Sequence, residues 1–496
     1  MWLTLDGEGS LFRQTYRALR AEILGGRLAR GFRLAPTRTL ALELGVSRNT
    51  VLQAYTQLLD EGYLVARRGS GTFVADTLPE DRALASGSNA TRGARAKAPG
   101  RGDGPPRLSR HAERSAASVP AGIAWGMPRR RLRFDFRYGE PAFGDLPLET
   151  WWRIHARRAR RATRAQLGYG PPTGAPELQK ALSQYLSRAR GVRCSPEQIL
   201  IVHGTQQAID LVARVLVDPG DRVAIEEPHY TGISLVLSSY GAELVPIAVD
   251  DDGLRTEALD AVAKVRGIFV TPSHQFPTGG ILPLSRRLAL LDCMERWGAF
   301  IVEDDYDGEY RYDGPPIECL QGLDESGRVL YVGSASKLLF PALRLGWLVA
   351  PESLLPALTR AKALADTGTA VLEQLVLAEL IEEGHLERHV RRARTRNAAR
   401  REALAAAIHR HLGGNAVLAG TGAGLHGLVW LPSIPMRREA ELRKRCAERG
   451  VGIYPVKPFY REPPAIAGFV LGFSAMDERA IAEGVKRLAT VVAGFR

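Results

Sequence analysis

The segment Ser334-Ala335-Ser336-Lys337 carries a lysine whose amine could hold an aldehyde as a Schiff base. A pyridoxal-type cofactor needs such an amine, an acid that keeps its ring nitrogen protonated, donors for its phosphate, and an aromatic wall beside its ring. Candidates for all four requirements occur between residues 204 and 344. The chain therefore predicts a pyridoxal 5'-phosphate site in which Lys337 is the catalytic residue.

The candidate acid follows an apolar run, Phe300-Ile301-Val302, that is typical of a buried strand. Because side chains alternate along a strand, Asp304 and Tyr306 should share one side while Asp305 faces the other. We expect Asp304 to pair with the ring nitrogen and Tyr306 to donate a hydrogen bond to the phenolic oxygen of the ring. Protonation of that nitrogen makes the ring an electron sink.

The phosphate donors are expected where a strand leads into a helix, at Gly204-Thr205-Gln206. Unpaired backbone N–H groups and the helix dipole favour an anion at such a point. Ser334, Ser336 and Arg344 would complete the phosphate site, with the guanidinium acting as a two-pronged clamp. Tyr230 is the candidate aromatic ring that stacks on the cofactor.

Each of these signals is weak when taken singly. A serine pair before a lysine is common, an acidic strand end is often solvated, and a glycine before a helix often only caps it. Their joint order along the chain is what favours the cofactor site.

A second kind of chemistry is indicated near the start of the chain. The run Leu40–Leu44, the turn Gly45-Val46 and the helix N-cap Ser47 have the order of a helix-turn-helix. The next helix should bury one face and leave Arg48, Asn49 and Thr50 free to meet base edges and phosphates. The alternative interpretation is a small helical domain with a solvated polar face.

This region resembles the GntR-type winged helix family. Four stretches carry the resemblance in order and spacing, namely Leu34–Arg38, Leu44–Val51, Leu58–Leu64 and Gly69–Val74. The resemblance implies DNA contacts from the second helix, its flanks and a wing. The predicted DNA-binding residues are Arg38, Ser47, Arg48, Asn49, Thr50, Arg68 and Gly69.

Short β-branched runs recur between helical stretches in the remainder of the chain, as at Ile199–Val202 and Val329–Val332. This alternation predicts an α/β fold with a mostly parallel sheet, helices on both faces, and a smaller subdomain from about Gly424 to Arg496. Together with the cofactor candidates, it resembles the fold-type I aminotransferase family from Phe134 onward. By that likeness Lys337 forms the internal aldimine and Tyr169 reaches the phosphate of a neighbouring subunit, so a homodimer is implied.

Two departures from the aminotransferase pattern bear on activity. Phe276 stands where aminotransferases usually place an asparagine beside the ring oxygen, which leaves that contact to Tyr306 and His274. Val470 occupies the place where many of them carry an arginine that grips a substrate carboxylate. We therefore do not expect ordinary amino-acid turnover.

The composition limits the possible partners, compartment and domain organisation of the protein. The 496 residues are 45% hydrophobic and 24% charged, and the net charge of +13 favours a polyanionic partner. The four cysteines lie far apart, which predicts neither a metal site nor disulfides and favours the cytoplasm. No apolar run is long enough to span a bilayer. We expect three parts: a winged helix-turn-helix at 1–77, a flexible basic linker at 78–131, and an aminotransferase-like domain at 132–496.

This architecture resembles the MocR/GabR-type bacterial transcription regulators. The resemblance implies a regulator that binds an operator with repeated half-sites and senses an amine, an amino-acid-like effector or pyridoxal phosphate itself at Lys337. The alternative is an active pyridoxal phosphate-dependent aminotransferase with a DNA-binding appendage. The sequence names neither the effector nor the operator.

Overall fold

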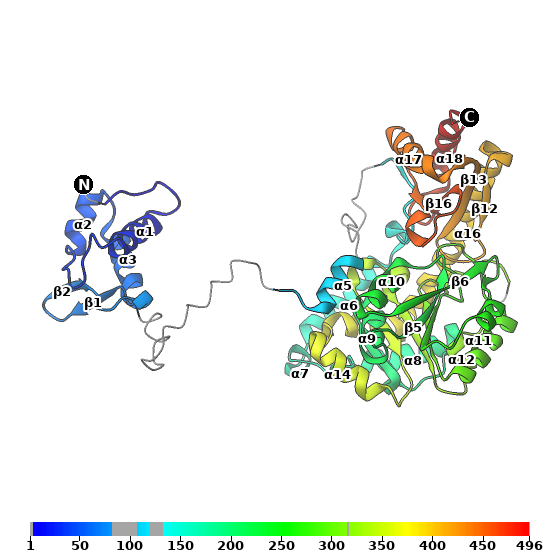
Figure 1. The fold of residues 1–496 in the computed structure, drawn as a ribbon, viewed down its shortest axis with the longest axis horizontal. Helices are drawn as coiled ribbons and strands as arrows, with labels where there is room; N and C mark the ends of the chain where they lie inside the picture. The colour runs from blue at the N-terminus through cyan, green and yellow to red at the C-terminus, as the bar shows by residue number, and fades with distance from the viewer. Residues whose placement is uncertain (1–2, 82–106, 119–131, 315–316, 496) are drawn as a thin grey trace, which may run out of the picture. The chain divides into compact units, whose positions relative to one another are not determined.

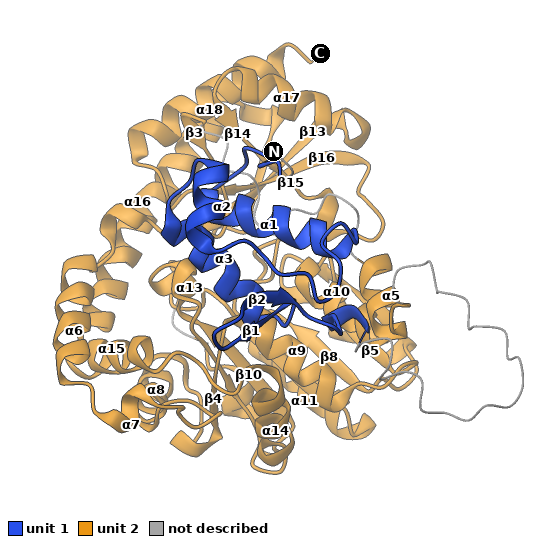
Figure 2. Ribbon diagram, turned by 90° about the vertical axis from the view of Figure 1, so that its left-hand side faces the viewer, with its two compact units in different colours: residues 1–105 blue, residues 106–496 orange. Residues whose placement is uncertain are grey.

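The computed structural model describes residues 3–81, 107–118, 132–314 and 317–495. The chain divides into two compact units, Met1–Pro105 and Pro106–Arg496, which Figure 2 distinguishes by colour. Most of the stretch 78–131, expected to be a linker, lies outside the described residues. No helix in the described ranges is both long and apolar enough to cross a membrane.

The described part of unit 1 includes helices α1, α2 and α3 and a hairpin of strands β1 and β2. Their bounds are α1 Leu11–Leu24, α2 Thr37–Leu44, α3 Arg48–Asp60, β1 Leu64–Arg67 and β2 Gly71–Val74. Gly45 ends α2 with a φ of 64°, a left-handed conformation that favours glycine. The Ser47 side chain caps α3 by accepting a hydrogen bond from the Thr50 backbone N–H at 3.1 Å. The predicted winged helix-turn-helix is confirmed.

One face of α3 is buried, as its spacing predicts. Val51, Ala54, Tyr55 and Leu58 lie in the apolar core of unit 1. That core also includes Leu78. The Tyr63 hydroxyl donates to a Glu80 carboxylate oxygen at 2.6 Å. Unit 1 therefore packs residues beyond position 77, where the linker was expected to begin.

Unit 2 is built on an eight-stranded sheet of order β4-β11-β10-β9-β8-β5-β6-β7. The bounds are β4 Ile199–Val202, β5 Arg222–Glu227, β6 Glu243–Asp250, β7 Gly253–Leu254, β8 Gly267–Val270, β9 Phe300–Asp305, β10 Val329–Ser334 and β11 Gly346–Val349. The neighbours from β10 through β9, β8 and β5 to β6 are parallel, whereas β11 and β7 are antiparallel to their neighbours. The expected mostly parallel sheet is confirmed.

Helices cover both faces of this sheet (Figure 1). Their bounds are α6 Leu148–Arg161, α7 Arg164–Leu167, α8 Pro176–Arg190, α9 Thr205–Leu216, α10 Thr231–Tyr240, α11 Leu284–Trp297, α12 Leu320–Leu323, α13 Ala335–Leu338, α14 Leu355–Asp366, α15 Val371–Glu382 and α16 His385–His411. Alternate residues of β4 face opposite layers: Leu200 and Val202 pack with α9, and Ile199 and Ile201 pack with α8 and α15. β4 is therefore apolar on both sides.

The C-terminal subdomain has its own four-stranded sheet, of order β12-β13-β16-β15. The bounds are β12 Val417–Ala419, β13 His426–Pro435, β15 Tyr454–Pro455, β16 Ile466–Gly472, α17 Glu439–Glu448 and α18 Glu478–Ala493. The subdomain also takes in the start of the unit, because β3 Phe134–Asp135 pairs in parallel with β14 Val451–Gly452. This pairing brings the segment after residue 135 next to the large sheet.

The expectation of a flexible stretch from 78 to 131 is wrong at α5 Arg110–Ser118, which is an ordered helix of unit 2. It packs on α10: the His111 and Tyr240 rings lie 4.9 Å apart between centroids, and Arg114 Nε donates to the Ser239 carbonyl at 2.9 Å. Composition misses this helix because it has no buried residue of its own and depends on a surface supplied by the body.

The end of β9 is anchored from behind by a buried ion pair. Arg190 Nε lies 2.7 Å from Asp305 Oδ2, with side-chain exposures of 6% and 1%. The same guanidinium donates to the Gly308 carbonyl and to the Ser273 hydroxyl, both at 2.9 Å. This pair fixes the side of β9 opposite to Asp304.

Replacing Arg190 by methionine should lower the free energy of unfolding of unit 2 by about 3–5 kcal/mol, because Asp305 would remain buried without its cation. The matched control is Arg188→Met, since the Arg188–Glu387 pair is exposed and such pairs contribute less than about 1 kcal/mol. Urea denaturation followed by tryptophan fluorescence measures both. Equal losses would contradict the anchoring role.

Candidate functional site

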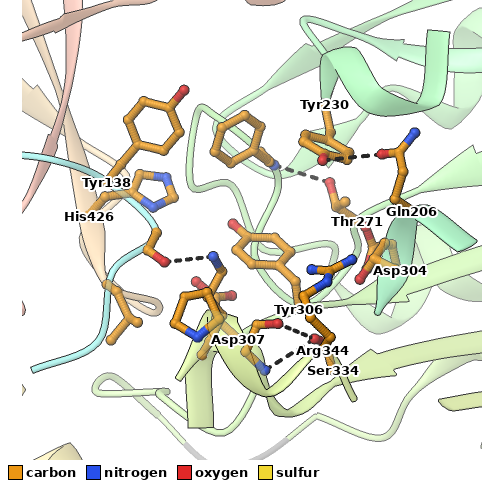
Figure 3. Close-up of a pocket in the computed structure, with 17 residues that line it drawn as sticks. Tyr138, Gln206, Tyr230, Thr271, Asp304, Tyr306, Asp307, Ser334, Arg344 and His426 are labelled. Carbon is orange, nitrogen blue, oxygen red and sulfur yellow. Dashed lines mark hydrogen bonds between the residues drawn. The ribbon is translucent and has the colours of Figure 1, made fainter. Parts of the chain in front are cut away.

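The parallel strands β8, β9 and β10, and β4 at the sheet edge, point their carboxyl ends toward one cavity of about 250 Å³ in unit 2. Figure 3 shows the side chains around it. Its lining is Tyr138, Gly139, Thr205, Gln206, Tyr230, Thr271, Phe276, Asp304, Tyr306, Asp307, Ser334, Ser336, Lys337, Pro341, Arg344, Leu425 and His426. Ligands of α/β proteins gather at such strand ends.

Nine of the residues predicted from the sequence line this cavity. They are Lys337, Asp304, Tyr306, Tyr230, Thr205, Gln206, Ser334, Ser336 and Arg344. Gly204 lies directly behind, since it is the N-cap of α9, and a Cβ there would lie 3.5 Å from the Arg344 guanidinium. Tyr169 is the exception, because it is 95% exposed and does not line the cavity of its own chain.

Lys337 lies on α13, the short helix that follows β10. Its Nζ donates a hydrogen bond to the Gly139 carbonyl at 2.6 Å. Burial lowers the pKa of Lys337, although the carboxylates of Asp307, Asp304 and Glu140 act in the opposite direction. A lysine of lowered pKa is neutral at a lower pH than a free one, and the neutral amine is the form that attacks a carbonyl carbon.

Asp304 faces the cavity from β9, whereas Asp305 faces Arg190, as the alternation along the strand predicts. Burial, as the largest cause, and the neighbouring acids Asp305 and Asp307 together raise the pKa of Asp304 to about 8. Within the part of the chain that the structure describes, its Oδ1 is buried without a hydrogen-bond partner. A buried acceptor of this kind calls for a donor, and a protonated ring nitrogen is one.

Tyr306 enters the cavity from a hydrogen-bonded network behind it. Its hydroxyl lies 2.9 Å from His274 Nδ1, and that nitrogen lies 3.0 Å from Asp307 Oδ2. Burial by itself would lower the pKa of His274, but the Asp307 carboxylate outweighs burial and raises it. His274 is 1% exposed and does not line the cavity. Its contact is therefore with Tyr306 rather than with the cavity itself.

The opposite end of the cavity suits an anion. Thr205 and Gln206 begin α9, so the backbone N–H groups of its first turn point outward there. Ser334 Oγ donates to Ser336 Oγ at 2.9 Å. Arg344 has a φ of 52°, which a non-glycine residue adopts only when its surroundings hold it, and its guanidinium donates to the His203 carbonyl.

The lining also includes Tyr138, Gly139, Asp307 and His426, to which sequence reasoning assigned no role. Three of them lie far from the lysine motif, two just after β3 and one at the start of β13. Only Asp307, one residue after Tyr306, was adjacent to a recognised motif. The others carry no local signal, because they reach the cavity through the docking of the C-terminal subdomain.

In unit 1 the predicted DNA-contact residues are exposed, apart from the half-buried Thr50. Arg48 and Asn49 occupy the first turn of α3, and Arg38 lies on α2. Arg68 and Gly69 form the turn between β1 and β2. The hydroxyls of Ser47 and Thr50 hydrogen-bond each other at 2.8 Å, so these two residues also serve as the helix cap.

Two family models match the chain. Aminotransferase class I and II matches residues 134–488, and the gntR family of bacterial regulatory proteins matches residues 11–74. The chain is 41% identical over 491 residues to the probable rhizopine catabolism regulatory protein MocR of Rhizobium meliloti, covering 98% of this chain and 94% of that one. It is 34% identical to the regulator TauR of Rhodobacter capsulatus, covering 98% of each chain.

The fold of unit 2 also matches solved aminotransferases. The α-aminoadipate aminotransferase LysN of Thermus thermophilus, complexed with N-(5'-phosphopyridoxyl)-L-leucine, is 30% identical with a TM-score of 0.68 and covers 78% of this chain and 97% of its own. The pyridoxine biosynthesis regulator PdxR of Corynebacterium glutamicum is 28% identical over 95% of this chain and 93% of its own. Regulators therefore match both units, whereas the solved aminotransferase matches unit 2.

The contact between Gly139 and Lys337 can be tested by adding one methyl group. A Cβ at Gly139 would lie 2.9 Å from Lys337 Nζ, and the φ of 75° also disfavours alanine. We expect Gly139→Ala to weaken the apparent affinity for pyridoxal 5'-phosphate by about tenfold, measured by absorbance titration. Gly144→Ala is the control, because a Cβ there meets nothing within 4 Å. Unchanged affinity in Gly139→Ala would contradict the placement of the lysine.

Proposed function

The chain belongs to the MocR-type transcriptional regulators, in which a GntR-type DNA-binding domain is joined to an aminotransferase class I and II domain, and from this we propose that it binds a primary amine at Lys337 and that this binding changes its affinity for an operator. Its cofactor is pyridoxal 5'-phosphate. A regulator of bacterial genes acts on DNA in the cytoplasm, and we place this chain there.

The observation that carries the proposal is the unpaired buried carboxylate of Asp304 in the same cavity as a lysine of lowered pKa. Pyridoxal phosphate supplies an aldehyde that condenses with primary amines and a pyridine ring that withdraws electrons when protonated. A protonated ring nitrogen would satisfy Asp304 Oδ1 and hold that residue as the carboxylate. No described lining residue donates a hydrogen bond to this oxygen.

The remaining lining residues would bind different parts of the cofactor. The phosphate would be held at the first turn of α9 by Thr205, Gln206, Ser334, Ser336 and Arg344, with the backbone at Gly204. Tyr230 would stack on the ring, and Tyr306 would donate to the phenolic oxygen while its hydroxyl also contacts His274. Lys337 would supply the amine that an effector displaces.

An effector alters DNA binding only if it binds two shapes of the protein unequally. The Lys337 Nζ donates to the Gly139 carbonyl, and Gly139 follows β3, which pairs with β14 of the C-terminal subdomain. We infer that a change in the bonding of Nζ would alter this contact and would thereby shift the subdomain and the dimer that carries the DNA readers.

The dimer itself is inferred from the surface around α6 and α7. Tyr169, Leu167 and Trp152 are 95%, 76% and 57% exposed, which is unusual for large apolar side chains in one region. A second copy of the chain would cover them and bring Tyr169 to the phosphate site of its partner. Two DNA readers in one dimer require an operator with repeated half-sites.

Two other functions are favoured by specific relatives. A 2-aminoadipate transaminase of Thermus thermophilus is 33% identical over 73% of this chain, which favours an active aminotransferase. PdxR is named for pyridoxine biosynthesis, which favours pyridoxal phosphate itself as the signal. Steady turnover of an amino donor with a keto acid would support the enzyme, and operator binding that responds to cofactor without amine would support the second alternative.

The proposed function is tested with Lys337→Ala. Wild-type protein reduced with borohydride should retain the cofactor on the peptide that contains Lys337, detected by mass spectrometry. In separate, unreduced wild-type protein, the operator affinity should change on adding amines. Lys337→Ala should lose both responses, whereas Lys264→Ala, at an exposed lysine, should keep them. An amine response that survives in Lys337→Ala would refute the proposal.

The separation of the two units makes a further prediction. Arg48→Ala should weaken operator binding by about 1–3 kcal/mol if this side chain reads a base, and it should leave cofactor uptake unchanged. Arg13→Ala, at an exposed arginine of α1, is the control and should change neither property. Fluorescence anisotropy with labelled operator measures the first property, and absorbance measures the second. Parallel loss of both would show that Arg48 acts on folding instead.

A further inference from the structure

The cavity has two ends with different chemistry. The end formed by Thr205, Gln206, Ser334, Ser336 and Arg344 is suited to the phosphate. The other end consists of Tyr138, Gly139, Phe276, Asp307, Leu425 and His426. Figure 3 shows Tyr138 and His426 on one side of the cavity and Gln206, Arg344 and Ser334 across from them, with Tyr306 in between. We call the set around Tyr138 and His426 the effector end, because it is left over once the cofactor is placed.

The effector end has no cation to meet an acidic ligand. Among the described lining residues, the only Lys and Arg are Lys337 and Arg344, and the proposed function uses both for the cofactor. Arg137 precedes Tyr138, but its guanidinium lies 3.6 Å from Asp135 and 3.9 Å from Glu140, and it stacks over the Tyr454 ring. It is therefore already engaged with acids.

The histidine in this end does not supply a positive charge. Burial, followed by the charge of His274, lowers the pKa of His426 well below its ordinary value, so its imidazole is neutral. Asp307, 1% exposed, adds an acidic group instead. A carboxylate brought here would lose its hydration and would find no unpaired cation among the described residues, because His274 is already paired with Asp307 at 3.0 Å.

The wall behind the effector end is apolar as well. Val470 of β16 is fully buried and packs in one cluster with Phe276, Leu428, Val456 and Phe459. Position 470 therefore presents an apolar side chain in a packed cluster and offers no cation to the cavity.

Polar atoms at this end nevertheless lack partners. Asp307 Oδ1 and His426 Nε2 are buried, and neither has a hydrogen-bond partner among the residues that the structure describes. Asp307 Oδ1 accepts only, and the neutral imidazole accepts on one of its two nitrogens. Both atoms call for a ligand that brings O–H or N–H donors, because a buried unpaired polar atom is costly.

From these observations we propose that the effector is a primary amine with an uncharged, hydroxyl-bearing body, of the amino alcohol class, and not an amino acid. The inference rests on the proposed function, since it assumes that an amine reacts at Lys337. The amine enters toward Lys337, its hydroxyls meet Asp307 and His426, and its carbon skeleton lies against Phe276 and Tyr138.

The test uses two pairs of amines that differ in one group. Serinol is compared with L-serine, and 4-amino-1-butanol with 4-aminobutyrate, each titrated into full-length protein loaded with pyridoxal 5'-phosphate. The readouts are the absorbance change of the bound cofactor and the operator affinity. Free pyridoxal phosphate titrated with the same amines corrects for their intrinsic reactivity. We expect each alcohol to act at a concentration lower by about tenfold or more than its matched acid.

A variant keeps the assignment testable at the residue level. Asp307→Asn removes the acidic group while keeping the size of the side chain. It should therefore reduce the ratio between the effective concentrations of L-serine and serinol. Val470→Arg should narrow it too, by adding a cation, provided that cofactor absorbance shows the variant to be folded. An unchanged preference in Asp307→Asn would contradict the role of its charge.

The outcomes separate this inference from the proposed function. Equal response to alcohol and acid, or a stronger response to the acid, overturns the effector class while leaving an amine sensor. No response to any of the four amines, with cofactor still bound to Lys337, overturns both. A preference for the alcohols in both readouts supports the inference.

Discussion

Desolvation of charged side chains at the carboxyl end of β9 is the constraint on which the rest of unit 2 depends. Asp304 and Lys337 lie in the same buried cavity, and burial pushes the pKa of the acid up and that of the amine down. Both shifts favour neutral forms. Buried polar groups without partners cost free energy, so such a site favours a bound ligand. A ligand with a ring nitrogen and a reactive aldehyde suits it.

The surrounding structure holds this arrangement from three sides. Behind β9, Arg190 neutralises Asp305, so that alternation along one strand separates a structural acid from a functional one. Beside it, His274 and Asp307 hold the Tyr306 hydroxyl. From the start of the unit, the Gly139 carbonyl accepts the hydrogen bond of Lys337. Each support comes from a different segment, and the segment of Gly139 follows β3, which pairs with β14 of the C-terminal subdomain.

The chemistry of the cavity supports the proposed role as a sensor. The cations in its described lining are limited to Lys337 and Arg344, and the cluster around Val470 closes the far wall with apolar side chains. In the proposed function, a site with these properties reacts with an amine and does not bind a carboxylate. Because the same chain carries a winged helix-turn-helix with an exposed Arg48 and Asn49, we propose that the presence of an amine changes binding to DNA.

The sequence by itself determined the two kinds of domain and most of the cofactor end of the site. Lys337, Asp304 and the residues at the start of α9 follow strands whose apolar runs are local signals, and strand ends of a parallel sheet meet at one edge. The tertiary structure alone decided the effector end. Tyr138 and His426 reach the cavity only because β3 pairs with β14 and the C-terminal sheet docks on the large one. It also decided the order of α5, whose stability comes from α10 and not from its own composition. Local patterns encode periodicity and capping, whereas contacts between segments hundreds of residues apart arise from packing, which no single stretch of sequence records.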